Sequence, residues 1–191
     1  ELADGLPEVL NDEHTQFRIN LKQGIYWSDG TEFTADDVIY TLDTYFSGTE
    51  CLNWFGISVI TGYVKSYTKV DNYTIEVETQ KPAYTFAATM GTPNWGPRLN
   101  IVPKHVFEKE SNLCEFRNPN PLTLGPYTVK EFDPNGFWQL WELREDWERS
   151  AWADLDTDDY MPKYVLYKDF GPEETRSLSF IQNQYDVDTF M

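Results

Sequence analysis

The stretch "GIYWSDGTEFTADDVIYTLDTYF", residues 24–46, places a turn, a helix cap and an amphipathic helix in close succession. Asp29-Gly30 predicts a tight turn, because glycine adopts the positive φ that other residues resist. Thr34 and Asp37 form a capping box, in which the hydroxyl accepts a free backbone N–H of the first helical turn. Apolar residues then follow at helical spacing: Val38, Ile39, Leu42, Tyr45 and Phe46. We therefore expect a helix that begins after Thr34 and ends near Gly48.

Strands are predicted wherever apolar and polar residues alternate. Such segments lie at residues 17–23, 72–82, 127–132, 135–146 and 164–170. Asn135-Gly136 predicts a hairpin turn between the third and fourth of them. Short helices are expected at residues 82–90, 103–110 and 171–183, each with a proline at its start. Residues 51–67 fit a loop with a short helix, so the chain reads as a mixed α/β protein.

The charge and composition exclude several classes of protein. The 191 residues include 32 acidic and 15 basic ones, which gives a net charge of −17. This charge disfavours binding to nucleic acids and anionic membranes, because both would be repelled. A hydrophobic fraction of 40%, with 7 Trp, 12 Tyr and 12 Phe, excludes a disordered chain. No apolar run approaches the roughly 18 residues that a membrane span needs. The sequence thus describes a globular protein rich in aromatic residues.

Catalytic and metal-binding patterns are not found. His14 and His105 show no zinc-site spacing and are interpreted as surface residues, and neither a nucleophile elbow nor a phosphate-binding loop occurs. Asp154, Asp156 and Asp158 have the spacing that opens a calcium loop. The glycine and the glutamate that such a loop requires are missing, which favours a solvated acidic loop. We assign no catalytic residue, metal or cofactor.

Two cysteines and two loop tryptophans leave alternatives open. Cys51 and Cys114 form no CxxC motif, so they are either a disulfide of an exported protein or two buried thiols. Trp54 and Trp95 lie in glycine-containing loops, "NWFG" and "NWGP". Loops carry binding sites more often than they carry core, so stacking on a ligand and internal packing weigh equally for these two.

The segment "FRINLKQGIYWSDGTEFTADDVIYTLD" resembles the family 5 extracellular solute-binding proteins, the oligopeptide- and dipeptide-binding components of ABC importers. Their pattern is an alternating strand, a "DG" turn and "T-A-(E/D)-DV" opening a helix. The similarity continues through "NIVPKHVFEK" and "LTLGPYTVKEFDPNGFWQLWELREDWE" to "YKDFGPEETRSLSFIQNQYDVD". Thr123-Leu124 and Asn183-Gln184 depart from the usual Gly-Thr and Gly-Glu, which indicates a remote subfamily.

The resemblance implies a fold and a domain organisation. The expected fold is the mixed-sheet lobe of a type II periplasmic-binding-protein-like protein with an inserted α+β subdomain. Sheet-lobe segments would cover about 1–50 and 160–191, and the inserted subdomain about 51–159. Family members run to roughly two or three times this length, more than one typical domain, so we expect a fragment of the first lobe.

The resemblance also implies a function. The expected role is the substrate-binding component of an ABC transporter, a monomer located in the periplasm or anchored at the cell surface as a lipoprotein. Its partners would be a peptide or small-molecule ligand and a permease and ATPase complex, not nucleic acid. The position of each residue suggests ligand contacts at Trp54, Phe55, Trp95, Asp188 and Thr189. A cleft closes on its ligand from both sides, so the fragment alone should bind weakly or not at all.

Three other readings stay open. The ligand could be a sugar oligomer, because several loop tryptophans would suit a sugar face. The chain could instead be a carbohydrate-active enzyme or its binding module, although no pair of carboxylates stands out. A structural or adhesive surface domain would bind no small ligand at all.

Overall fold

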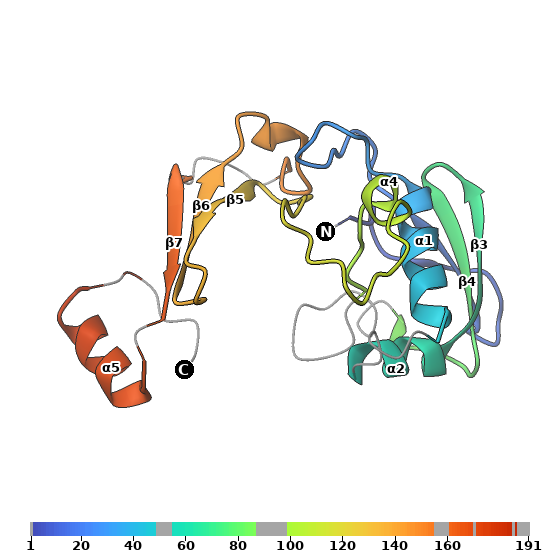
Figure 1. The fold of residues 1–191 in the computed structure, drawn as a ribbon. Helices are drawn as coiled ribbons and strands as arrows, with labels where there is room; N and C mark the ends of the chain where they lie inside the picture. The colour runs from blue at the N-terminus through green and yellow to red at the C-terminus, as the bar shows by residue number, and fades with distance from the viewer. Residues whose placement is uncertain are drawn as a thin grey trace.

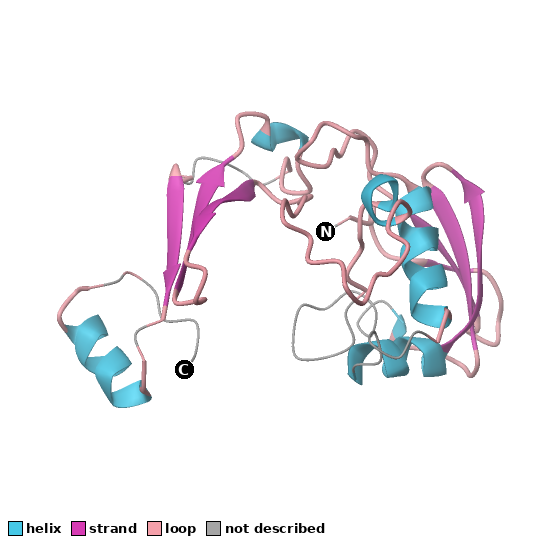
Figure 2. Ribbon diagram, viewed as in Figure 1, coloured by secondary structure: helices cyan, strands magenta, loops and turns pink. Residues whose placement is uncertain are grey.

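The computed structural model describes residues 2–48, 55–86, 99–154, 161–169, 171–184 and 186, with the side chains of residues 55 and 56 excluded. Two antiparallel sheets lie at opposite ends of an arch, and loops connect them across its top (Figure 1). Helices α1, α2 and α4 accompany the first sheet, and α5 follows the second (Figure 2). The predicted mixed α/β class is confirmed.

The first sheet has the strand order β1-β2-β4-β3. Its strands are β1 (Glu8–Val9), β2 (Gln16–Asn20), β3 (Val64–Asp71) and β4 (Thr74–Thr79). The predicted alternation puts Phe17 opposite Val77 and Ile19 opposite Ile75, so apolar side chains of two strands share one face. That face packs against a helix, and the other is solvated.

Helix α1 (Ala35–Phe46) covers the apolar face and begins with the predicted capping box. The Thr34 side chain accepts from the Asp36 backbone N–H at 3.2 Å, and Asp37 accepts from the Thr34 backbone N–H at 3.0 Å. Gly48 has a φ of +72°, in the left-handed region that ends helices. The core under α1 contains Phe17, Phe33, Val38, Leu42, Ile60, Val64, Ile75 and Val77.

Two strands, β1 and β3, were not predicted. Within the unassigned segment 51–67, helix α2 (Phe55–Tyr63) runs directly into β3, and no loop residue separates the two elements. The signal that could have revealed β3 is the Asp71-Asn72 turn. The Asp71 side chain accepts from the Tyr73 backbone N–H at 2.8 Å and closes the β3–β4 hairpin. Residues 51–54 lie outside the described part.

The second sheet has the order β5-β6-β7, with β5 (Tyr127–Phe132), β6 (Trp138–Leu143) and β7 (Tyr164–Lys168). All three strands were predicted, as was the hairpin turn, where Gly136 has a φ of +83°. Helix α4 (Lys104–Phe107), the 3-10 helix η2 (Trp147–Arg149) and α5 (Glu173–Ile181) complete the described elements. The sequence also predicted a helix at residues 82–90, of which residues 87–90 lie outside the described part of the chain.

Strand pairing crosses both positions at which the sequence suggested a subdomain boundary. Strand β4 pairs with β2 across residue 50, and β7 pairs with β6 across residue 160. The division into sheet-lobe segments and an inserted subdomain stays a prediction. Among the described residues, no helix has the length and apolarity that crossing a bilayer requires.

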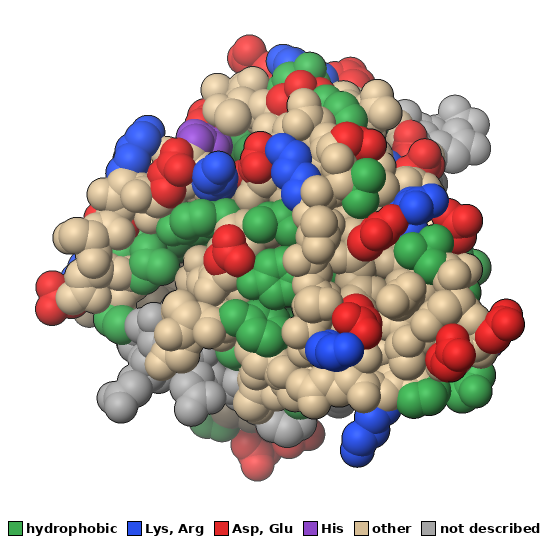
Figure 3. Space-filling model, turned by 90° about the vertical axis from the view of Figure 1, so that its right-hand side faces the viewer, with side chains coloured by type: hydrophobic (Ala, Val, Ile, Leu, Met, Phe, Trp, Pro, Cys, Tyr) green, Lys and Arg blue, Asp and Glu red, His purple; other side chains and the backbone are tan. Residues whose placement is uncertain are grey.

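The solvated face of the first sheet carries cross-strand ion pairs. Arg18 donates to Glu76 at 2.8 Å, and Lys65 donates to Glu78 at 2.7 Å. In Figure 3, which views the molecule from the β3 side of Figure 1, acidic and basic side chains lie next to one another. Such exposed pairs each contribute little to stability, about 0–1 kcal/mol.

Asp37 should stabilise the fold far more than its neighbour Asp36. Asp37 is 5% exposed, and its carboxylate also accepts from the Lys104 backbone N–H at 2.9 Å. Asp37→Ala leaves two backbone donors without an acceptor and should lower the free energy of unfolding by about 2–3 kcal/mol. Asp36→Ala is the matched control: it removes a surface pair with Lys69 and should cost less than about 1 kcal/mol. Equal losses in thermal or urea unfolding would contradict this role.

Candidate functional site

The turn region Ile25–Phe33 joins the two sheets. Ser28 donates its backbone N–H to the Thr123 carbonyl at 3.0 Å, and the Thr123 N–H donates back to the Ser28 hydroxyl at 3.2 Å. The Tyr26 N–H donates to the Arg149 carbonyl at 2.8 Å. These backbone hydrogen bonds connect the turn to the loops on either side of the β5–β6 hairpin.

The contact between the Ile25–Phe33 turn and the loops that hold Thr123 and Arg149 is called the joint below. Arg144, directly after β6, is its charged centre. Its side chain is 3% exposed. One Nη donates to the Tyr26 carbonyl at 3.2 Å and to the Gly125 carbonyl at 3.1 Å, and the other donates to the Trp27 carbonyl at 3.3 Å. Arg144 thus holds backbone from both sides of the joint with one rigid fork of donors.

Asp146 neutralises the buried guanidinium. Arg144 Nε and Nη2 donate to the two carboxylate oxygens of Asp146 at 3.0 Å each, a bidentate pair. The hydrogen bond from Arg144 lowers the pKa of Asp146 below its ordinary value of 3.8. Next to it, the Arg149 guanidinium lies 3.6 Å from the centre of the Tyr26 ring. The joint is therefore built mainly from hydrogen bonds and charge.

Helix α4 is held to the same turn. His105 Nε2 lies 2.7 Å from the Asp29 carboxylate. Burial raises the pKa of Asp29, but hydrogen bonds from Thr31 and His105 outweigh it and hold that pKa below 3.8. His105 is on its predicted short helix, with its ring engaged by Asp29. His14 is only partly exposed, because its ring packs 4.6 Å from the Tyr84 ring.

The structure does not place the predicted ligand contacts. Trp54, Trp95, Asp188 and Thr189 lie outside the described residues, and Phe55 is described only by its backbone, which opens α2. The described residues on either side of these segments do have defined positions. They show from which part of the fold each predicted contact starts.

The connections that carry Trp54 and Trp95 are anchored at one end of the first sheet. Phe86, just before residues 87–98, stacks on Phe17 with ring centres 4.2 Å apart and lies parallel to Tyr63 at the end of α2. Just after that connection, the Asn100 backbone N–H and carbonyl both bond the hydroxyl of Tyr45, in the last turn of α1, at 3.3 Å. The ends of both connections are thus tied to α1 and α2.

The connection that carries Asp188 and Thr189 starts elsewhere. It follows α5, which Figure 1 shows at the opposite end of the arch from α2. The described residues that flank Trp54 and Trp95 therefore lie in one region, and those that precede Asp188 and Thr189 lie in another. The described residues hold no group of three or more His, Cys, Asp or Glu side chains that could bind a metal ion.

A comparison with known families decides the classification. The family model of the bacterial extracellular solute-binding proteins, family 5 (middle part), matches residues 1–190. The chain belongs to this family. The resemblance seen in the sequence is thus confirmed over nearly the whole chain.

Relatives within this family and of this fold are longer than the chain. The periplasmic oligopeptide-binding protein OppA of Escherichia coli (strain K12) is 28% identical over 149 residues, 70% of this chain and 26% of that protein. Peptide-bound OppA of Listeria monocytogenes has a TM-score of 0.72 and 19% identity, covering 97% of this chain and 36% of that one. A mannohexaose-bound periplasmic oligopeptide-binding protein of Thermotoga maritima also has a TM-score of 0.72, with 22% identity, covering 97% and 32%.

These comparisons confirm the expected fold, and the chain spans only 26% to 36% of the length of these three relatives. Within the family pattern, sequence reasoning assigned no role to Arg144. The available signal was the "R-x-D" at Arg144 and Asp146, placed where an alternating strand ends. The pair itself is local, but the four carbonyls that Arg144 also binds belong to distant segments.

Arg144 should be the side chain on which the joint most depends. Arg144→Ala leaves several buried carbonyls and Asp146 without their donor, so the free energy of unfolding should fall by about 3 kcal/mol or more. Arg144→Lys keeps the charge but loses the planar fork of donors, so its free energy of unfolding should lie between those of the wild type and Arg144→Ala. Arg18→Ala, which breaks ion pairs on the solvated face, is the control and should change stability little. A small effect of Arg144→Ala in urea unfolding would contradict the role of the joint.

The Arg144–Asp146 pair should appear in the dependence of stability on pH. Because the folded pKa of Asp146 is below 3.8, its contribution is present above pH 3.8 and is lost as pH falls through the lowered folded value. The stability difference between the wild type and Asp146→Asn should therefore shrink at low pH. Glu145→Gln, at an exposed neighbour, should keep the wild-type profile. Parallel profiles of wild type and Asp146→Asn from pH 7 to pH 2 would refute the assignment.

Proposed function

We propose that the full-length protein is the substrate-binding component of an ABC transporter and captures oligopeptides for import. The observation that carries the proposal is the family match over residues 1–190. The names of the Escherichia coli and Listeria monocytogenes relatives support peptide as the ligand. The implied partners are a membrane permease and an ATPase. The protein would act as a monomer, and its charge of −17 argues against nucleic acid.

The ligand contacts that we propose are Trp54, Phe55, Trp95, Asp188 and Thr189. Phe55 opens α2 and Trp54 directly precedes it, Trp95 belongs to the connection between Phe86 and Leu99, and the last two follow α5. A peptide would be held by backbone hydrogen bonds and by its charged ends, with aromatic side chains packing along it. The 191-residue chain alone should bind weakly, because a closing cleft needs both of its walls.

The protein would bind its ligand without chemical conversion. The two histidines have structural neighbours: His105 pairs with Asp29, and His14 packs on Tyr84. Arg144 and Asp146 are bound to each other and to the backbone of the joint. These groups serve the fold, and the family match over residues 1–190 supports a binding protein over the carbohydrate-active enzyme that the sequence left open.

An extracytoplasmic location fits the cysteine chemistry. Cys114 is disulfide-bonded, which favours the exported alternative over two buried thiols. Disulfides persist in oxidising compartments outside the cytoplasm and are rare inside it. We propose the periplasm or the cell surface, with a lipoprotein anchor in the second case.

A sugar oligomer is the second candidate ligand. It is favoured by the mannohexaose in the Thermotoga maritima relative and by the loop tryptophans Trp54 and Trp95. The two ligands differ in how they would use these rings. A sugar would stack on an indole face and quench or shift tryptophan emission.

Trp54 and Trp95 should contribute directly to affinity. In the full-length protein, Trp54→Ala and Trp95→Ala should each weaken peptide binding about tenfold or more, as expected when a central aromatic contact is lost. Trp152 is 49% exposed beside the joint, so Trp152→Ala is the matched control and should keep wild-type affinity. Isothermal titration calorimetry with peptide mixtures and with mannose oligomers measures the affinity for both candidate ligands. Unchanged affinity in both loop variants would contradict the proposed contacts.

A further inference from the structure

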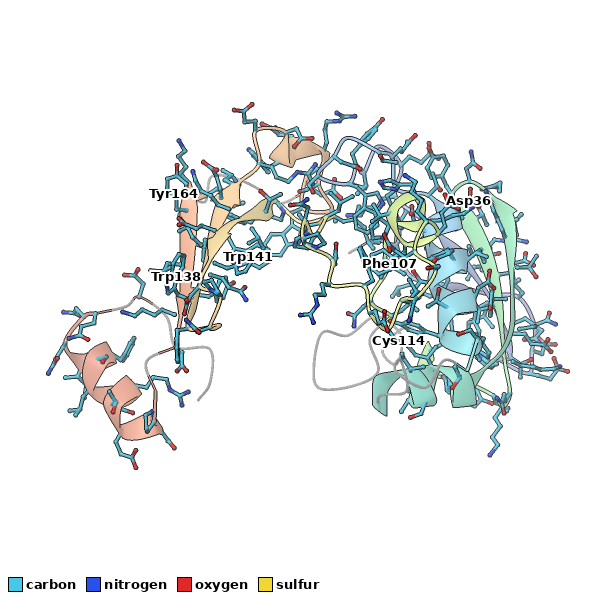
Figure 4. All side chains as sticks on the ribbon, in the orientation of Figure 1. Asp36, Phe107, Cys114, Trp138, Trp141 and Tyr164 are labelled. Atoms are coloured by element: carbon cyan, nitrogen blue, oxygen red, sulfur yellow. The ribbon has the colours of Figure 1, made fainter. Side chains whose placement is uncertain are left out.

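The second sheet leaves large apolar side chains in water at β7. Leu166 is 58% exposed, and Tyr167 is 54% exposed. Consecutive side chains of a strand point to opposite faces of its sheet, so these two lie on different faces. Figure 4 shows Trp138, Trp141 and Tyr164 on the same sheet, at the end of the arch away from α1. Among the described residues, neither face of the sheet is covered at β7.

One face of the sheet is aromatic, and the other is charged. The strand register puts Phe132, Trp141 and Tyr167 on one face, which we call the aromatic face. The Trp141 ring meets the Tyr167 ring edge to face, with ring centres 6.2 Å apart. On the other face, Lys130 donates to the Glu142 carboxylate at 3.0 Å. Charge suits contact with water, whereas the aromatic face favours contact with other apolar groups.

Helix α5 exposes its apolar side as well. Leu178 is 58% exposed and Ile181 is 75% exposed, and their spacing of three residues puts them on one side of the helix. The residue of α5 that is buried is the polar Ser179. Helices in proteins are stabilised mostly by packing of an apolar side, and α5 has only nine residues. Its stability therefore requires a cover over Leu178 and Ile181.

Strand β7 has a free edge. It is the last strand in the order β5-β6-β7 and pairs with β6 alone among the described strands. Edge strands that face water are usually protected by charged residues or proline, and within β7 only Lys168 is charged. The edge therefore has the character of a strand inside a wider sheet. We call the free edge, the aromatic face and the apolar side of α5 together the β7–α5 surface.

Charge and chain length select what covers this surface. The net charge of −17 and the two glutamates in the first turn of α5 disfavour an anionic membrane. The chain spans only 26% to 36% of the three relatives, so most of each relative lies outside the matched region. A segment of the same polypeptide is held nearby, at an effective concentration on the order of millimolar. Such a segment is favoured over a second copy of the chain.

We propose that polypeptide of the full-length protein outside residues 1–191 covers the β7–α5 surface. One strand of this polypeptide pairs with the free edge of β7, and its backbone hydrogen bonds set the register. Apolar side chains of the same polypeptide pack on the aromatic face and on Leu178 and Ile181, which removes these groups from water. The second sheet then has more than the three strands described.

Photo-crosslinking in the full-length protein tests what lies on this surface. A benzophenone amino acid replaces Tyr167 in one variant and Leu178 in another, and the irradiated protein is digested and analysed by mass spectrometry. Both positions should link to peptides of the same chain from outside residues 1–191. Tyr84, 76% exposed beside the first sheet, is the control position and should give no such link. Links to a second copy, seen as a dimer on a denaturing gel, or no link from either position would overturn the proposal.

Thermal unfolding of the full-length protein tests the burial. Leu166→Asp and Ile181→Asp should each lower the melting temperature by several degrees, because each puts a charge beneath the cover. Leu6→Asp is the matched control: Leu6 is 86% exposed near the first sheet, and the melting temperature should change little. Unchanged melting temperatures in both test variants would overturn the cover. If an aspartate variant does not fold, the crosslinks still decide, because they come from a sequence without a buried charge.

Discussion

A buried guanidinium needs a partner for its charge and for each of its donors, and this requirement organises the structure around Arg144. Its fork binds carbonyls of the Ile25–Phe33 turn, carbonyls at residues 123 and 125, and the Asp146 carboxylate. These groups come from distant parts of the sequence. Arg144 can therefore be buried only when both sides of the joint are in place.

The joint matters because the two sheets share little apolar core. In the described part of the chain, the buried apolar cluster comes from residues 17–86, with Ala151 as the single later member. The second sheet instead exposes large apolar side chains, including Phe132, Leu166 and Tyr167. Its connection to the first sheet thus depends on directional hydrogen bonds, which fix an orientation better than apolar contact does.

Local patterns predicted most of the elements. Alternation at Phe17 and Ile19 indicated β2, the Thr34 and Asp37 cap indicated α1, and Asn135-Gly136 indicated the β5–β6 hairpin. Each depends on residues only a few positions apart. Strand β3 was missed because it follows α2 without a break, so neither the helical nor the strand spacing of apolar residues is clear at the boundary.

Long-range features could not be predicted in this way. The carbonyls around Arg144 carry no side-chain signal, and the pairing of His105 with Asp29 joins residues 76 positions apart. The ligand contacts were chosen by position in the family pattern, and most lie outside the described residues. The family was accessible from sequence because its motif is long and continuous across residues 17–43.

The central claim is that this family 5 chain belongs to a protein that captures peptides for import. Native mass spectrometry of the full-length protein, purified without denaturation, tests it most directly because a co-purified ligand adds its own mass to that of the protein. The account predicts a ladder of peptide masses on the protein. Hexose-spaced masses, or empty protein that gains no mass when peptides are added, would contradict it.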